Sequence, residues 1–183
     1  ADGAAELGIT GADLIEEGSR PVEQVLDLEF GKCRLIVAVR DDHPASVAGA
    51  VAPGTRVATS FPQLTSRYFA ELGVSVEIAA MSGAVETAPH LGVSHVILDL
   101  SSMGSTLLVH GLREIATVMT SPVRPCANSQ AYADPGQRPT LDSPVASLQS
   151  VLQAGKQRYL MAHDAAAPPP DTRTLLTRNT APK

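Results

Sequence analysis

Short apolar runs alternate with polar and amphipathic segments along most of this chain. A strong run covers residues 33–39, with Leu35, Ile36, Val37 and Val39, and another covers residues 96–98. Apolar runs of this length, bounded by turn residues, predict strands that are buried on both faces. Further strands are predicted at residues 7–9, 25–29, 56–59, 74–79 and 114–120.

Helices are predicted between these strands, at residues 12–17, 64–73, 82–90 and 107–111. Pro62 is suited to the first turn of the second helix and Gly73 to its end. Residues 143–157 carry apolar side chains at helical spacing, residues 41–54 suit a loop around a short helix, and residues 159–162 suit one more strand. Alternating strands and helices predict an α/β fold with largely parallel sheets, which binds ligands beyond the carboxyl ends of its strands.

Composition narrows the possible functions. The chain has 183 residues, 44% of them apolar and only 3% aromatic, so its core must rest on Ala, Val, Leu and Ile. The net charge is −5 and no basic block is present, which argues against duplex nucleic acid as a partner. The sequence shows no membrane span and no secretion signal, and Cys33 and Cys126 suit reduced thiols of a cytoplasmic protein. The histidines have no zinc-site spacing.

The segment with the clearest candidate chemistry is Asp99-Leu-Ser-Ser-Met-Gly-Ser-Thr-Leu. Asp99 ends a predicted strand, and a turn rich in hydroxyl groups then leads into a predicted helix. Such a turn can bind an anion through free backbone N–H groups and side-chain hydroxyls. Because a carboxylate repels a bare phosphate but suits sugar hydroxyls, the segment suggests a phosphorylated sugar. The alternative is an ordinary helix N-cap.

Several segments in order resemble the ATP phosphoribosyltransferase family, the first enzyme of histidine biosynthesis. The most specific is the Asp99 segment; the others are residues 6–14, 28–35, 56–69, 83–89, 111–114, 148–154 and 158–161. The resemblance implies a two-lobed α/β body like a type II periplasmic binding protein, with mixed or parallel sheets and a cleft between the lobes. Residues 1–40 and 121–163 would form an incomplete first lobe and residues 41–120 the second. Residues 164–183, which follow a Pro-rich stretch, are expected to be disordered.

The resemblance also implies the reaction and the roles of residues. N1 of the adenine of ATP would displace pyrophosphate from phosphoribosyl pyrophosphate, with Mg²⁺ accompanying the pyrophosphate. Asp99 would hold the ribose hydroxyls, and the 5′-phosphate would bind the next polar residues of the loop. These loop residues are Ser102, Gly104, Ser105 and Thr106.

Other positions carried over from the family have structural alternatives. Glu86 would face the cleft, or it is a helix acid satisfied by the helix dipole. Ser60 and Phe61 would lie near the nucleotide, although the Phe61 side chain could instead act as a hydrophobic staple. Thr10 and Gly11 would line the other lobe. Arg67 could touch phosphate, although a solvated helix face is the simpler interpretation.

The chain also departs from the family pattern. Met103 stands in the loop where a small or hydroxyl residue is usual. The family's first strand and basic loop, and its C-terminal histidine-binding domain, have no counterpart here. The chain is therefore expected to be either the transferase, assembled as a homo-oligomer, or an inactive remnant of it. A small-molecule-binding module of the same fold is a further alternative.

Overall fold

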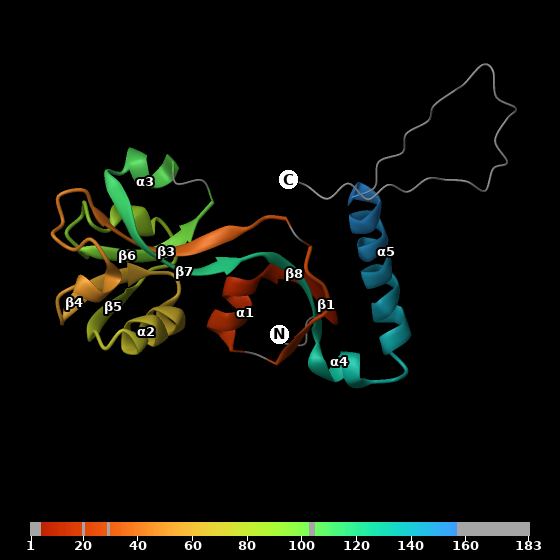
Figure 1. Cartoon of the computed structure of the whole chain (residues 1–183). Coiled ribbons are helices and arrows are strands. Elements are labelled where there is room, and N and C mark those ends of the chain that lie inside the picture. Colours follow the sequence, from red (N-terminus) through yellow and green to blue (C-terminus); the bar gives the residue numbers. More distant parts are fainter. Residues whose placement is uncertain (1–4, 20, 29, 103–104, 157–183) are drawn as a thin grey trace, which may run out of the picture.

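The computed structural model describes residues 5–19, 21–28, 30–102 and 105–156. Their strands form two sheets, and the larger one, with five strands, lies at the left of Figure 1. The smaller, three-stranded sheet lies at the centre, and a long helix stands beside it at the right (Figure 1).

The larger sheet is mixed, with the strand order β5-β4-β6-β3-β7. β4 runs parallel to β5 and β6, whereas β3 runs antiparallel to β6 and β7. The expectation of largely parallel sheets was therefore wrong, because β3 enters from the other sheet and runs antiparallel to both of its neighbours, β6 and β7; the mixed arrangement that the family resemblance also allowed is the one present. The strands are β3 (Cys33–Arg40), β4 (Thr55–Thr59), β5 (Val76–Ala80), β6 (Val96–Ser101) and β7 (Leu112–Ser121).

The smaller sheet is antiparallel throughout, with β8 between β1 and β2. Its strands are β1 (Leu7–Gly11), β2 (Val22–Gln24) and β8 (Val123–Asn128). The helices associated with it are α1 (Ala12–Gly18), α4 (Ser129–Ala133) and α5 (Arg138–Lys156).

Two passages of chain join the sheets. One is the segment between β2 and β3, and the other is Pro122, which alone separates β7 from β8. Both passages leave the larger sheet at one edge, because Cys33 at the start of β3 pairs with Ser121 at the end of β7. β3 belongs to the larger sheet, although the sequence placed residues 33–40 with the first lobe.

Side chains alternate between the two faces of the larger sheet, and apolar residues point to both faces. Both faces are therefore covered by other elements. Val96 and Leu98 pack with α2 (Pro62–Glu71), whose Leu64 and Phe69 are buried, and the short 3₁₀ helix η1 (Ala48–Ala50) covers the same side. Ile97 faces the opposite side. That side is covered by the 3₁₀ helix η2 (Val85–Thr87) and the short helix α3 (Ser105–Val109).

Most of the predicted elements are present, but several differ from the prediction. The strand expected at residues 25–29 lies at Val22–Gln24, and the helix expected at 82–90 is only the turn Val85–Thr87. β6 continues two residues past Asp99, and α5 begins five residues before Ser143. β8 was not predicted. The strand expected at residues 159–162 and the tail at 164–183 lie outside the described residues.

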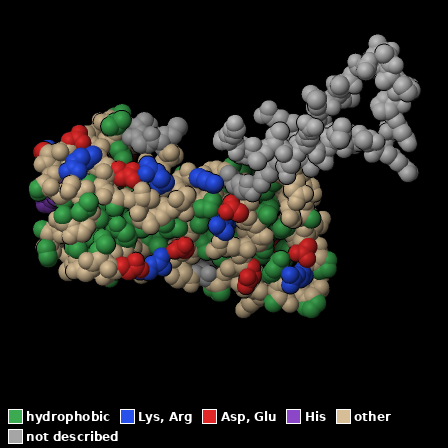
Figure 2. Space-filling view, in the orientation of Figure 1, with side chains coloured by type: hydrophobic (Ala, Val, Ile, Leu, Met, Phe, Trp, Pro, Cys, Tyr) green, Lys and Arg blue, Asp and Glu red, His purple; other side chains and the backbone are tan. Residues whose placement is uncertain are grey.

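Charged side chains of opposite sign are interspersed over the face shown in Figure 2. Several charged side chains of the described residues form ion pairs, including Arg34 with Glu114 and Arg56 with Glu77. No described helix is long and apolar enough to cross a membrane. Cys33 and Cys126 are free thiols.

Candidate active site

The carboxyl ends of β5, β4 and β6 lie at one edge of the larger sheet. Thr59, the last residue of β4, is paired with Ala80 on one side and Leu98 on the other. The residues that follow these partners, Ser60, Met81 and Asp99, therefore emerge together. This is the edge at which open α/β sheets bind ligands, and it is the edge from which both passages lead to the smaller sheet.

Asp99 lies within β6 rather than at its end, opposite Ile36 of β3. The sequence predicted a terminal position, but Leu100 and Ser101 also pair with β3. Strand alternation places Asp99 on the same face as Ile97, which packs with Val85 of η2 and Leu107 of α3. Asp99 therefore lies at the border of the hydrophobic cluster that contains Ile97, Val85 and Leu107. Its side chain is half-buried and not enclosed by that cluster.

The environment of Asp99 disfavours its negative charge. Burial raises the pKa of this carboxyl above its usual value, the Leu100 N–H lowers the pKa by donating a hydrogen bond, and the charge of Glu86 raises it further. Glu86 lies in η2, which packs against β6. The two acids thus meet at one edge although they are distant in sequence. A raised pKa beside a second carboxylate is typical of a functional site.

The turn before Glu86 has an unusual backbone. Gly83 has φ +150° and Ala84 has φ +51°, so two successive residues adopt positive φ. A side chain makes the left-handed region costly at Ala84. The turn replaces the first part of the helix that the sequence predicted, and it brings Glu86 to the sheet edge.

The predicted phosphate loop is described only in part. Ser102 and Thr106 are exposed, and the backbone of Ser105 begins α3. Met103 and Gly104 lie outside the described residues. The hydroxyl-rich segment therefore does lead from the Asp99 strand into a helix, as its sequence predicted.

The turn after β4 carries Ser60 and Phe61. Ser60 is partly exposed at the edge, whereas the side chain of Phe61 is only 4% exposed and packs in the core with Leu64. Phe61 is thus a core residue, but it is the N-cap of α2 rather than the preceding residue from which a hydrophobic staple is made. Its burial leaves little of the ring surface for a nucleotide.

Thr59 holds this turn in place, and sequence reasoning missed it. Its buried Oγ1 accepts a hydrogen bond from the Phe61 N–H at 2.9 Å and another from the Thr65 hydroxyl at 3.1 Å. Thr65 Oγ1 lies 2.7 Å from the Phe61 carbonyl oxygen. The sequence did contain a signal for this role: Thr59 is a threonine at the end of a predicted strand, just before a predicted helix.

Thr10 and Gly11 lie at the end of β1 in the smaller sheet, paired with Arg124 and Val123 of β8. Both are partly exposed. Gly11 directly precedes α1, the helix that contacts α2 of the larger sheet.

Arg67 points from α2 to α1 and pairs with Glu16, with the two charged groups 2.7 Å apart. This exposed pair agrees better with a solvated helix face than with a phosphate contact. A hollow of about 190 Å³ lies beside the pair. Its lining comes from α1, α2 and β7, namely Glu16, Leu64, Arg67, Tyr68, Glu71, Val118 and Met119.

Two sheets joined by two passages, both of which leave the larger sheet at the edge that carries Asp99, define a two-lobed α/β protein with a fold like that of the type II periplasmic binding proteins. Solved structures agree with this class. The periplasmic aliphatic sulphonate binding protein SsuA from Escherichia coli matches 83% of this chain and 56% of its own at a TM-score of 0.54. The identity is 15%, so this likeness concerns the fold alone.

The chain belongs to the ATP phosphoribosyltransferase (HisG) family, whose pattern matches residues 1–153. It is 45% identical over 168 residues to the ATP phosphoribosyltransferase of Gemmatimonas aurantiaca, covering 89% of this chain and 58% of that relative. The chain thus spans a little over half the length of the curated relatives it matches. A chain of the HisG:HisZ ATP phosphoribosyl transferase complex from Thermotoga maritima matches with a TM-score of 0.73 and 26% identity, covering 83% of this chain and 72% of that one.

Proposed function

We propose that this chain catalyses transfer of a phosphoribosyl group to ATP. N1 of the adenine attacks the anomeric carbon of phosphoribosyl pyrophosphate, the bond to the pyrophosphate oxygen breaks, and pyrophosphate leaves with the bonding electrons. The position of Asp99 carries the proposal. A half-buried carboxylate at the ligand edge of the sheet, followed by a hydroxyl-rich turn, supports this reaction in a member of this family.

In this proposal Asp99 accepts hydrogen bonds from the ribose hydroxyls. Ser102, Gly104, Ser105 and Thr106 bind the 5′-phosphate, and ATP lies between the lobes near Ser60, Thr10 and Gly11. Substitution at an anomeric carbon passes through a state with positive charge on the sugar. Holding the two substrates in line and stabilising that charge would supply most of the acceleration.

Mg²⁺ is the proposed metal. Burial is the main reason that the pKa of Asp99 is raised, and the charge of Glu86 raises it further; a cation between the two carboxylates would relieve their repulsion. Two carboxylates suit Mg²⁺ when the remaining ligands are waters and phosphate oxygens. When bound, the ion would neutralise charge on the pyrophosphate. Glu86 and Asp99 are the residues that would hold it.

Oligomeric assembly and a cytoplasmic location are also proposed. Ile9, Leu14 and Phe30 are each more than half exposed, although they are large and apolar. Contact with further copies of the chain would cover such side chains. Analytical ultracentrifugation of the purified chain tests this point. The two free thiols and the biosynthetic family support the cytoplasm.

Release of pyrophosphate from ATP plus phosphoribosyl pyrophosphate tests the reaction. We expect Asp99→Ala to lower kcat/KM about 10- to 100-fold or more, since a charge-assisted hydrogen bond is lost. Glu77→Ala is the matched control, because it removes an exposed acid of β5, which β4 separates from the Asp99 strand β6. Equal rates from the unaltered chain and Asp99→Ala would defeat the role of Asp99.

The two alternatives predict other outcomes. A chain that binds phosphoribosyl pyrophosphate, with a raised melting temperature, but releases no pyrophosphate would be an inactive remnant. A chain that binds neither substrate would favour a module for another small molecule.

A further inference from the structure

α1 bridges the two lobes and is anchored at both ends. At its start, the Ala12 N–H donates to the Pro122 carbonyl at 3.1 Å, and the Asp13 N–H donates to Ser121 Oγ at 3.0 Å. The Ser121 hydroxyl in turn donates to the Asp13 carboxylate. Asp13 and Ser121 are 4% and 2% exposed. These buried contacts fix α1 to the passage between β7 and β8.

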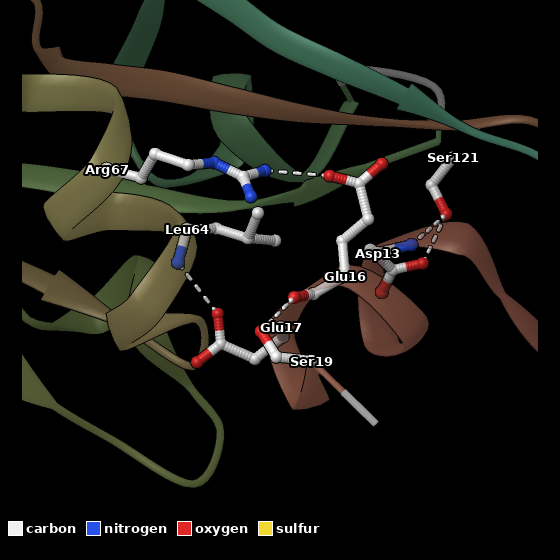
Figure 3. Close-up of polar contacts among 7 residues, drawn as sticks. All are labelled: Asp13, Glu16, Glu17, Ser19, Leu64, Arg67 and Ser121. Carbon is white, nitrogen blue, oxygen red and sulfur yellow. Dashed lines mark hydrogen bonds and ion pairs between the residues drawn. The ribbon is translucent and has the colours of Figure 1, made fainter. Parts of the chain in front are cut away.

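The other end of α1 carries Glu17, whose carboxylate binds the first turn of α2. Its two oxygens accept hydrogen bonds from the Gln63 and Leu64 N–H groups, each at 2.9 Å. Figure 3 shows the contact to Leu64 and the Glu16–Arg67 pair beside it.

The first turn of α2 depends on this contact for its capping. The first N–H groups of a helix have no partner within the helix, and the N-cap residue here is Phe61, whose side chain makes no capping hydrogen bond. Pro62 has no N–H to satisfy. Glu17 therefore supplies from the smaller lobe the cap that α2 lacks, and its charge suits the positive end of the helix.

The same turn positions one side of the candidate active site. Phe61 is tied to Thr59, and Ser60 lies between them at the edge that carries Asp99. The neighbouring Glu16–Arg67 pair also crosses between the lobes. Its side chains are 43% and 56% exposed, so it contributes little to holding them.

We propose that Glu17 is a positioning residue: by clamping the first turn of α2 it holds the Asp99 edge and the smaller lobe in the arrangement that binds phosphoribosyl pyrophosphate. The role in ligand binding rests on the proposed function. The clamp itself does not, and it can be tested without ligand.

Amide hydrogen exchange tests the clamp. In Glu17→Ala we expect exchange at Gln63 and Leu64 to become about tenfold faster or more, as loss of a charged acceptor allows. Glu17→Gln keeps one acceptor oxygen and should give an intermediate rate. Glu16→Gln is the matched control, because it removes the adjacent charge but touches neither amide. Unchanged exchange in Glu17→Ala would overturn the clamp.

Ligand binding tests the positioning role with the same variants. We expect KM for phosphoribosyl pyrophosphate to rise at least fivefold in Glu17→Ala while kcat stays within about twofold, because bound ligand restores the arrangement at a cost in affinity. Glu16→Gln should keep the original KM.

The outcomes separate the two proposals. Faster exchange with an unchanged KM would overturn the positioning role, and so would an equal rise in KM in Glu16→Gln. An unaltered chain with slow exchange at Gln63 and Leu64 but no affinity for phosphoribosyl pyrophosphate would overturn the proposed function, and the positioning role with it, while leaving the clamp supported.

Discussion

Asp99 and Glu86 meet at one edge of the larger sheet although they lie on different elements. Burial is the main reason that the pKa of Asp99 is raised, and the charge of Glu86 adds to it. An acid whose pKa is raised by folding binds its proton more tightly in the folded state than in the unfolded state. Its ionised form therefore opposes folding.

Replacing Asp99 with Asn is expected to stabilise the fold at neutral pH. The ordinary pKa of Asp is about 3.9. The loss of stability caused by ionised Asp99 is therefore absent below that pH, and it is complete above the raised pKa that Asp99 has in the folded state. We expect Asp99→Asn to raise the free energy of unfolding, and with it the Tm, at pH 7 to 8.

Urea unfolding between pH 4 and pH 8 measures this gain, which should shrink as the pH falls through the raised pKa of Asp99. Asp142→Asn on the exposed surface of α5 is the control. Equal stability of Asp99→Asn and the original chain at pH 8 would contradict the prediction.

Replacing Glu86 with Gln should lower the pKa of Asp99. The substitution removes the neighbouring negative charge but leaves the burial of Asp99 in place, so the pKa should fall and stay above its ordinary value. NMR titration of the Asp99 side-chain carbon measures the change. Glu77→Gln on β5 serves for comparison. A pKa of Asp99 that does not move in Glu86→Gln would show that the two charges are not coupled.

Thr59→Val should destabilise the protein by about 1–3 kcal/mol. Valine has nearly the same shape but leaves the buried Phe61 N–H without its acceptor. Thr55→Val on the same strand is the control, because the Thr55 hydroxyl bonds to the Ala52 carbonyl near the surface. Chemical denaturation of both variants measures the difference. A loss at Thr59 no larger than that at Thr55 would argue against the buried hydroxyl as the support of this turn.

Ala84→Gly should stabilise the protein by on the order of 0.5–1 kcal/mol. Ala84 has φ +51°, which costs an L-residue about 1–2 kcal/mol, and glycine removes that cost at the expense of unfolded-state entropy. Ala79→Gly within β5 should have the opposite effect, since strand interiors disfavour glycine. Thermal unfolding distinguishes the two. A lower Tm in Ala84→Gly would contradict the prediction.

Local sequence signals predicted the central elements of the fold well. The apolar runs gave β3 and β6, and Pro62 and Gly73 marked the ends of α2, where Gly73 has φ +70°. These signals succeed because a strand that is buried on both faces needs a run of apolar residues, and a backbone position with positive φ favours glycine.

Two of the errors lie in segments that contain proline. No strand was predicted at residues 123–128, which include Pro125, yet β8 is the central strand of its sheet, and the Pro125 carbonyl accepts a hydrogen bond from the Val25 N–H. The helix predicted to start at residue 143 begins at Arg138, and α5 continues through Pro144. Proline excludes one donor but does not fix what its neighbours do when tertiary contacts favour pairing.

Glu17 left no local signal of its role. Its partners are 46 and 47 residues away, on a helix whose own N-cap is an apolar residue. Likewise, the coupling of Glu86 to Asp99 depends on how η2 packs on β6. Contacts between elements set these relationships, and a single sequence does not reveal them.

The single residue between β7 and β8 also limits how this protein can be engineered. Because side chains alternate along a strand, one residue inserted beside Pro122 would turn Val123 and every second position after it toward the opposite surface of its sheet. The exposed bend at residues 134–136 carries no such constraint. A fluorescent reporter or affinity tag inserted into that bend would leave the two sheets intact. An insertion at Pro122 would disturb them, because this single residue sets the register between β7 and β8.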